Sequence, residues 1–386
     1  MKGVGNIFVL MATLASVACS SSRLEPEQPQ LGIYVSIAGL SEVKSDIGET
    51  VPVEDRETLI KNLDIWVFLS DDFDSTRPSG YCLGFLTPSQ NNDPLTGFEN
   101  RYYMTIPADI AQAHPNVDLY VIANTAGGSI NGVTGGLNAN TTRATLDSYL
   151  MSGTYYGLKG DGSINNTVVP NDGMPFTAVG KNLQMKGSFP VMNLEKVTLK
   201  RLASKVRFVT SQLADAAGPV MDFTIDEIAL DGNQISSYEY VFNDSANSYK
   251  IRKTGDDASD YVSGEVQFTP PSYADIAQNA APQEYAYQSG MSGQEYETLV
   301  FNGIKSGVLT DIGKCYLRES DKALSGRIKY TITGQAQKTA TFQMADGDVF
   351  ARNTSWIVYI YFLEDEMFFS VNWTPWVYGN EFNLTD

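Results

Sequence analysis

The chain has 386 residues, of which 42% are hydrophobic and 11% aromatic, so two or three domains with buried cores are expected and wholesale disorder is excluded. It carries 27 Lys and Arg against 45 Asp and Glu, a formal net charge of −18. Because a nucleic-acid binder needs a basic face, this balance excludes nucleic acid as a partner. One histidine and three cysteines also exclude most catalytic and zinc-site arrangements.

The N-terminal segment is typical of an export signal. Lys2 precedes an apolar run over residues 7–17 that is too short for a permanent membrane anchor. Small residues then lead into Cys19, a pattern that resembles the lipobox of bacterial lipoproteins, in which the cysteine is acylated. We therefore expect a signal peptide over residues 1–18 and lipidation at Cys19, with a plain secretory signal as the alternative. No later apolar run is long enough to be a second anchor.

Residues 31–39 predict an isolated first strand. Ile33, Val35 and Ile37 occupy every second position, which is the pattern of a half-buried strand. A long polar stretch separates this strand from the next candidate at residues 63–69, where apolar side chains occupy both parities. That composition indicates a strand covered on both faces.

The rest of the chain predicts further strands and few helices. Strands are expected at residues 117–124, 197–208, 221–230, 238–242, 298–301, 326–333, 356–363 and 368–373. A change of parity near Arg201 and Leu202 indicates a bulge or bend. Residues 142–151 have roughly helical spacing, and the Gly-rich residues 152–190 are expected to form loops. The fold class is therefore all-β, with two β-sandwich domains joined near residue 193 and a few short helices in the first.

Candidate catalytic and metal-binding residues are few. His114 has no nucleophile motif around it, and the Gly-rich residues 127–136 lack the Lys-Ser/Thr ending of a P-loop. The acidic clusters at residues 71–74, 256–257 and 346–348 do not follow EF-hand spacing. We expect solvated turns there, with a Ca²⁺ site as the alternative. No catalytic residue, metal or cofactor is therefore predicted, although a pair of carboxylates acting on a glycoside leaves no spacing in sequence.

Tryptophans and cysteines give weaker signals. Trp356, Trp373 and Trp376 have the aromatic character of a sugar-binding surface, but strand positions favour core packing. Cys82 and Cys315 are far apart in the sequence, so two isolated thiols are expected rather than a disulfide.

The two ends of the chain indicate a mode of assembly. The first strand precedes a polar segment with Lys44 and Arg56, and the chain ends in aromatic strands. A removable first strand together with long terminal strands predicts polymerisation by strand exchange. A sandwich that lacks one strand exposes unpaired backbone groups, and a strand from another subunit can pair with them.

The order of these segments resembles the FimA/Mfa-type fimbrillins, the type V pilins of Bacteroidales. The segments that carry the resemblance are the lipobox at Cys19, the strand at residues 31–39, LDIWVFLSDD, DLYVIANTAGG, GMPFTAVG at residues 173–180, VTLKRLASKVRF at residues 197–208, and the closing ARNTSWIVYIYFL and VNW. Phe176 and Thr177 stand where the family usually has Met and Ser. Each match is short, and their order along the chain makes the resemblance specific.

The resemblance implies transthyretin-like sandwiches and a processing step. The family is exported as a lipoprotein to the outer membrane and cut after a basic residue beyond the first strand. The groove that opens is filled by a neighbouring subunit. Carried onto this chain, residues 31–39 are the displaced strand, and Arg56 and Lys44 are the cleavage candidates. The family's use of Arg favours Arg56, whereas the acidic neighbours Asp55 and Glu57 disfavour it.

We expect a signal peptide at residues 1–18, a lipidated propeptide at 19–56, an N-terminal domain at 57–193 and a C-terminal domain at 194–386. The terminal segment is the expected donor. Its apolar row comprises Phe369, Val371 and Trp373, with Val377 in a second row beyond Pro375. The alternative is that residues 368–373 form an internal strand and only the tail beyond them is the donor.

The sequence therefore predicts a non-enzymatic structural subunit of a cell-surface fimbria that serves adhesion. Its expected partners are other fimbrial subunits, a processing protease and a host protein or glycan. The alternatives are a fimbrial tip or anchor subunit and a surface glycan-binding lipoprotein that retains its first strand.

Overall fold

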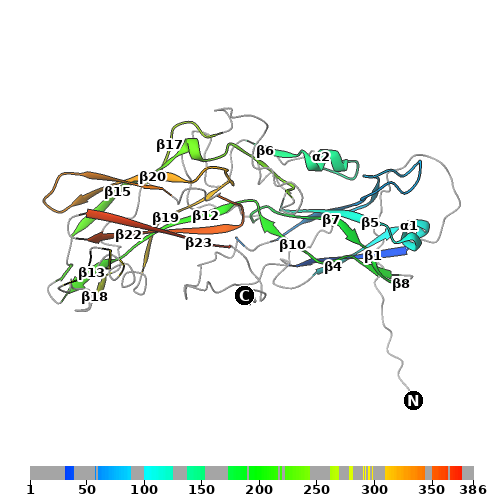
Figure 1. The fold of residues 1–386 in the computed structure, drawn as a ribbon, viewed down its shortest axis with the longest axis horizontal. Coiled ribbons are helices and arrows are strands. Elements are labelled where there is room, and N and C mark those ends of the chain that lie inside the picture. The colour runs from blue at the N-terminus through cyan, green and yellow to red at the C-terminus, as the bar shows by residue number, and fades with distance from the viewer. Residues whose placement is uncertain are drawn as a thin grey trace, which may run out of the picture.

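The structure of the protein is a computed structural model in which β-sheets predominate, and this confirms the all-β class (Figure 1). It describes residues 31–38, 57, 60–87, 100–124, 137–152, 173–188, 191–215, 218–219, 222–243, 261–268, 278–280, 290, 292, 294–295, 298, 309–343, 350–363 and 366–375. Statements about structure below concern these residues.

Two five-stranded sheets contribute to the first hydrophobic core. The first sheet has the order β10-β1-β9-β8, with β4 on β1, and comprises β1 (Leu31–Ala38), β4 (Asn100–Ile106), β8 (Lys186–Ser188), β9 (Val191–Asn193) and β10 (Val197–Thr198). The second sheet has the order β11-β7-β5-β2-β3 and comprises β2 (Leu63–Leu69), β3 (Cys82–Leu86), β5 (Asn116–Ala123), β7 (Phe176–Gln184) and β11 (Lys200–Arg201). Strand β2 is almost wholly buried, which confirms that it is covered on both faces.

A second core lies between two four-stranded sheets. The third sheet, in the order β19-β12-β22-β23, comprises β12 (Ser204–Thr210), β19 (Thr310–Leu317), β22 (Thr354–Leu363) and β23 (Glu366–Pro375). The fourth, in the order β17-β15-β20-β21, comprises β15 (Phe223–Asp231), β17 (Glu265–Phe268), β20 (Ser325–Ile332) and β21 (Lys338–Gln343). A small sheet comprises β13 (Gln212–Asp215), β14 (Gly218–Pro219) and β18 (Gln278–Ala280).

The α-helices of the described residues are short. Helix α1 (Ala108–Ala113) ends at His114, which adopts a left-handed conformation with φ 52°. Helix α2 (Arg143–Asp147) begins after Thr142, whose side chain accepts a hydrogen bond from the Thr145 backbone N–H. A 3₁₀ turn spans Gly232–Gln234. No described helix has the length and apolar character needed to cross a membrane.

The expected helix at residues 142–151 is shorter than predicted. After α2, the chain continues into strand β6 (Leu150–Ser152), which pairs with β16 (Tyr238–Tyr240). Strand β16 follows β15 of the second core, yet Val241 and Phe242 directly after it pack in the first core. This pairing therefore links the two cores.

Most of the expected strands are confirmed within a few residues, as β1, β2, β5, β15, β16, β20, β22 and β23. The expectation of loops throughout residues 152–190 is wrong, because β7 lies inside the second sheet between β5 and β11. Of the strand expected at residues 298–301, Thr298 is helical, and the other three residues lie outside the described ones. The bend near Arg201 and Leu202 is confirmed between β11 and β12.

Consecutive short strands carry the chain from one core to the other. Strands β10, β11 and β12 belong to the first, second and third sheets in turn. The first core includes Ala203 and the second begins at Val206, so the cores meet along β12, near the middle of the molecule in Figure 1. The domain boundary at residues 193–194 stays a prediction.

Candidate functional site

Strand β1 is the centre of the candidate site, because it is paired along both edges. It forms an antiparallel ladder of seven residue pairs with β4, from Leu31 opposite Ile106 to Ile37 opposite Asn100. Along its other edge it runs parallel to β9 and then to β10, where Ile37 lies opposite Val197. Removing β1 would therefore expose the hydrogen-bonding groups of two neighbouring edges.

The apolar row predicted for β1 is confirmed as part of the first core. Ile33 and Val35 are fully buried and Ile37 is 2% exposed. They pack in the same cluster as Met104 of β4 and Met192 of β9, which both lie opposite Ile33 in the register. Burial of side chains of this size contributes about 1.5–3 kcal/mol each. The space that β1 fills between β4 and the β9–β10 edge is called the β1 groove below.

The predicted lipidation and processing residues Cys19, Lys44 and Arg56 lie outside the described residues. Their roles stay predictions. The residue that follows Arg56 is described, and its position was not anticipated. Glu57 is fully buried, with 0% exposure.

Glu57 lies in a cluster of four polar residues between the two cores. Lys205 Nζ donates a hydrogen bond to Glu57 Oε1 at 2.8 Å, and the Tyr316 hydroxyl donates to the same oxygen. Arg201 Nε donates to the backbone carbonyl of Glu57 at 3.0 Å. We call Glu57, Arg201, Lys205 and Tyr316 the Glu57 cluster.

The Glu57 cluster buries ionisable groups, which is energetically costly unless they are paired. Lys205 is 2% exposed, and burial lowers the pKa of its ammonium group while the charge of Glu57 opposes that shift. Burial also raises the pKa of the Tyr316 hydroxyl, as does the charge of Glu57. Two buried opposite charges with shared hydrogen bonds tolerate little displacement, because breaking such a pair leaves an uncompensated charge.

Arg201 connects the cluster to the turn before β22. Its backbone N–H donates to Asn353 Oδ1 at 3.2 Å, and its guanidinium lies 5.5 Å from the centre of the Phe176 ring. Asn353 adopts a left-handed conformation with φ 58°, and its own N–H donates to the Ala203 carbonyl at 2.9 Å. The bend between β11 and β12 is therefore held from both cores.

The predicted donor residues Phe369, Val371 and Trp373 lie in β23. This strand pairs antiparallel with β22 over its whole length and forms one edge of the third sheet. Phe369 packs against the second core, with its ring 5.8 Å from that of Phe342. The geometry therefore favours the alternative in which residues 368–373 form an internal strand. Val377 lies outside the described residues.

A second buried charge cluster supports the link through β16. Glu239 and Glu319 are 1% exposed, and both carboxylates contact Nη2 of Arg352, with the Glu239 contact at 3.2 Å. Arg352 also donates to the Val241 carbonyl at 3.0 Å and to the Tyr240 carbonyl. These contacts hold the residues after β16, which pack in the first core, against the turn before β22.

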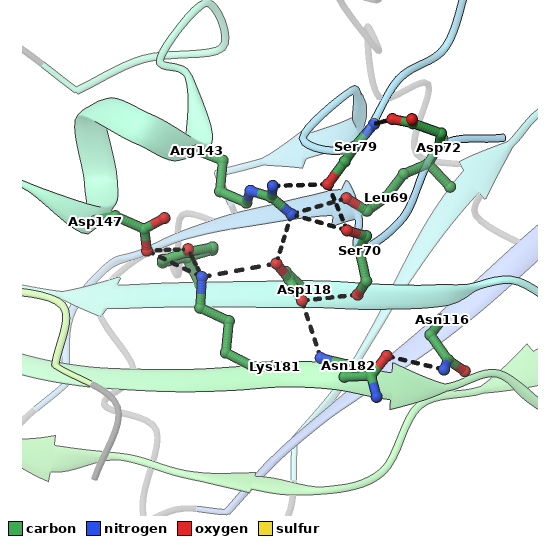
Figure 2. A network of polar contacts seen from close by, with 11 residues as sticks. Leu69, Ser70, Asp72, Ser79, Asn116, Asp118, Arg143, Asp147, Lys181 and Asn182 are labelled. Carbon is green, nitrogen blue, oxygen red and sulfur yellow. Dashed lines mark hydrogen bonds and ion pairs between the residues drawn. The ribbon is translucent and has the colours of Figure 1, made fainter. Parts of the chain in front are cut away.

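A polar network covers one end of the second sheet (Figure 2). Asp118 of β5 is 5% exposed and accepts hydrogen bonds from Ser70 Oγ at 2.7 Å, from Asn182 N at 2.9 Å and from Arg143 Nη1 at 2.9 Å. Arg143 Nη1 also donates to the Leu69 carbonyl at 3.1 Å.

Lys181 of β7 extends the same network. It forms an ion pair with Asp147 at 2.9 Å and with Asp118 at 3.6 Å, and it lies over the Tyr120 ring at 4.4 Å. The Tyr120 hydroxyl donates to Asp147 Oδ1 at 2.5 Å. Since these cations are paired with carboxylates and carbonyls of the chain itself, the network fastens α2 to the sheet.

The metal-binding and sugar-binding candidates from the sequence lie outside these clusters. Asp74 is held in a turn by Arg77, which lowers the pKa of its carboxyl group through a hydrogen bond. Trp356 is 2% exposed and stacks on Phe350, so it offers no surface for a sugar. The side chain of Trp373 and the whole of Trp376 lie outside the description, as do the acidic clusters at residues 256–257 and 346–348.

The thiols and the histidine are also separate. Cys82 and Cys315 are not joined by a disulfide, which confirms two isolated thiols, and burial raises the pKa of Cys315. His114 is exposed after α1. Among the described residues, no group of three or more His, Cys, Asp or Glu could hold a metal ion.

Comparison with known proteins gives a match in fold. No protein-family model and no curated protein match the chain by sequence. A Parabacteroides distasonis protein ascribed to cell adhesion superposes with a TM-score of 0.52 at 14% identity, covering 91% of this chain and 99% of that protein. The chain has the same fold. The comparison thus shows a likeness of fold to a protein ascribed to cell adhesion.

Two further solved structures are less similar. The tip fimbrial protein Mfa3 of Porphyromonas gingivalis, with a C-terminal truncation, gives a TM-score of 0.48 at 11% identity over 90% of this chain and 100% of that one. The fimbrillin FimA of P. gingivalis W83 gives 0.44 at 10% identity over 91% and 98%.

The Asp118 network yields a first prediction. Replacing Asp118 by Asn turns an acceptor toward Arg143 and Lys181 into a donor, so the free energy of unfolding should fall by about 1.5–3 kcal/mol. Urea unfolding measures this. The matched control is Asp147→Asn, which changes a more exposed partner of the same lysine and should cost less than about 1 kcal/mol. Equal losses in the two variants would contradict the proposed importance of Asp118.

The buried cluster of Glu239, Glu319 and Arg352 predicts a pH dependence of stability. Burial raises the pKa of Glu239 well above 4.5, Arg352 opposes the rise and Glu319 adds to it. The folded chain therefore holds a proton that the unfolded chain has lost, and the free energy of unfolding falls as pH rises from about 4.5 through the folded pKa. Glu239→Gln should abolish this fall and stabilise the protein by about 1–3 kcal/mol at pH 8.

The control for this measurement is Glu265→Gln on β17. Arg327 lowers the pKa of Glu265 to about 2 through hydrogen bonds, so the stabilising contribution of this exposed carboxylate rises up to about pH 4.5 and stays constant above it. Its loss should be at most about 1 kcal/mol. Thermal unfolding between pH 4 and 8 checks both variants. An unchanged pH slope in Glu239→Gln would refute the assignment.

Proposed function

We propose that the chain is a structural subunit of a cell-surface fimbria that serves adhesion. It is exported as a lipoprotein through Cys19 to the outer membrane, cut between β1 and Glu57, and polymerised by strand exchange. The observation that carries the proposal is the position of β1, which is paired on both edges and supplies three buried side chains to the first core. The shared fold with a protein ascribed to cell adhesion supports the proposed role.

Strand replacement is physically favourable at this place. An empty β1 groove would leave two rows of backbone donors and acceptors and the contacts of Ile33, Val35 and Ile37 unsatisfied. A donor strand from another copy would restore both if it presents apolar side chains at every second position. It would run parallel to β9 and β10 and antiparallel to β4.

The burial of Glu57 bears on the cleavage bond. A protease must draw the residues on both sides of the bond into its active site, and Glu57 follows Arg56 directly while being buried and hydrogen bonded. Cleavage is favoured where backbone and side chains are not held in this way. We therefore propose Lys44 as the processing site, with Arg56, which the family resemblance favours, as the alternative.

The donor is proposed to be the tail beyond β23. Strand β23 already makes a complete ladder with β22, and Phe369 contributes to the second core. Releasing β23 would therefore destabilise the domain to which it belongs. The tail includes Val377. The rival roles, a tip or anchor subunit and a glycan-binding lipoprotein, are distinguished by the experiments below.

Processing is tested with Lys44→Ala, Arg56→Ala and the double variant. The double variant should remain a folded, lipidated monomer, because β1 still fills its own groove. Lys44→Ala alone should behave in the same way, whereas Arg56→Ala should give a mature N-terminus at Ser45 and normal fibres. N-terminal sequencing of protein from cell surfaces and electron microscopy measure these outcomes.

Normal fibres from the double variant would overturn the processing proposal. A native N-terminus at Glu57 would reassign the bond to Arg56, and an acylated Cys19 in surface protein would favour an anchor subunit. A monomer that is retained on polysaccharide would favour the glycan-binding alternative.

The donor is tested by truncation after Pro375, which preserves β23. The shortened chain should unfold at the wild-type temperature and be processed normally, but it should form no SDS-resistant ladder when cleaved by a trypsin-like protease. Electrophoresis and electron microscopy check this. Fibres of ordinary length from the shortened chain would show that the tail is not the donor.

A further inference from the structure

We propose that Glu57 is a positioning residue that couples occupancy of the β1 groove to the junction between the two cores. The inference rests on the proposed strand exchange and concerns its regulation. The Glu57 cluster holds one wall of the β1 groove in the geometry that accepts a strand.

The wall in question is β10. Val197 and Thr198 pair with Ile37 and Ala38 of β1. Strand β10 packs closely against β7, because a Cβ added to Gly180 of β7 would lie only 3.0 Å from Val197 Cγ1. Strand β10 therefore contacts β1 on one side and the second sheet on another, and it cannot shift alone.

The wall continues directly into the Glu57 cluster. Leu199 is 1% exposed, and the next two residues form β11, in which Arg201 pairs opposite Phe176 of β7. The Arg201 side chain then binds the Glu57 carbonyl, and its backbone binds Asn353. A movement of β10 would therefore be transmitted to Arg201 within a few residues.

Glu57 joins this segment to the second half of the molecule. Its carboxylate accepts hydrogen bonds from Lys205 of β12 and Tyr316 of β19. Tyr316 lies on a strand of the third sheet but packs in the first core. The cluster therefore joins the second sheet, which carries Arg201, to the third sheet, which carries Lys205 and Tyr316. Arg201 and Lys205 lie on opposite sides of the bend between β11 and β12.

Coupling between two such sites is reciprocal. If a filled groove fixes β10 and thereby the cluster, then an intact cluster must also retain the strand in the groove. Weakening the cluster should weaken the binding of a strand by a factor within the range of about 5–150 that is typical of such coupling. Most of this change should appear as faster release, because variants of one interface differ in affinity mainly through their dissociation rates.

The experiment uses the full-length chain, cleaved between β1 and Glu57 by a trypsin-like protease, so that β1 remains bound without a covalent link. A fluorescent synthetic peptide of residues 31–38 is added in excess, and its uptake is followed by anisotropy. Glu57→Gln should take up the peptide at least about fivefold faster than the wild type.

Two further variants separate coupling from stability. In Glu57→Gln with Lys205→Met, the carboxylate and its paired ammonium group are removed together, so the unfolding temperature should lie closer to that of the wild type than it does in Glu57→Gln alone. Uptake should nevertheless remain at least about fivefold faster. The matched control is Lys186→Gln with Glu195→Gln, which removes an ion pair of 3.8 Å on the first sheet whose side chains are 62% and 63% exposed. This control should leave the uptake rate unchanged.

The outcomes distinguish the inference from the function on which it rests. If the wild-type chain takes up the peptide but the double variant at Glu57 and Lys205 does so at the wild-type rate, the coupling is refuted and strand exchange stands. If the control variant is accelerated as much as Glu57→Gln, the effect is not specific to the cluster and the coupling is also refuted. If no cleaved chain takes up the peptide, strand exchange itself fails and the coupling fails with it.

Discussion

The buried carboxylate of Glu57 is the constraint on which the arrangement of the two cores depends. Removing a carboxylate and an ammonium group from water costs several kcal/mol per ion, and only close pairing with additional hydrogen bonds compensates for this. Glu57 and Lys205 are at most 2% exposed, Tyr316 supplies an additional bond to the carboxylate, and Arg201 binds the backbone carbonyl of Glu57. Any rotation of one core against the other would separate these groups. The pair thus contributes more to fixing one geometry than to net stability.

Strand β1 combines two kinds of pairing, which in the proposed assembly make it both well bound and replaceable. Its antiparallel ladder with β4 uses seven residue pairs, whereas the parallel side is divided between the short strands β9 and β10. Affinity for a strand at this position is therefore dominated by backbone bonds and by an apolar row at alternate positions, which many sequences can satisfy. Selectivity must come from the shape of the buried side, where Met104 and Met192 lie opposite Ile33. Methionine side chains adapt to different neighbours, which in the proposed assembly suits a groove that receives first its own strand and then another.

The apolar periodicity of the sequence predicts the strands in which this pattern is strong. It does not predict the elements whose position depends on tertiary packing. Strands β1, β2 and β22 have dense apolar patterns and were predicted within two residues. Strand β7 was missed because Gly180 and Asn182 interrupt its apolar pattern, yet Gly180 is required by the close approach of Leu183 and Val197. The Glu57 cluster was missed because the sequence gives no partner for a lone acidic residue. A signal existed in Lys205, which alternates with the buried Val206 and therefore lies on the opposite face of β12, and that face is buried as well.

The two cores are joined by links of different chemistry, and this bears on how the molecule carries force along a fibre. In the proposed assembly, tension enters at the β1 groove in the first sheet and leaves through the segment after β23 in the third. The covalent path between them runs through the bend at Leu202 and Ala203, which by itself would act as a hinge. The Glu57 cluster holds this bend on one side, and the β6–β16 pairing with Arg352 holds the cores together at a second place. Two cores that are joined at one place can rotate about it, whereas cores that are joined at two separate places cannot. The second link therefore makes the connection between the cores rigid. Strain at the junction would then be shared between a buried ion pair, which resists separation of charges, and a strand pair, which resists sliding.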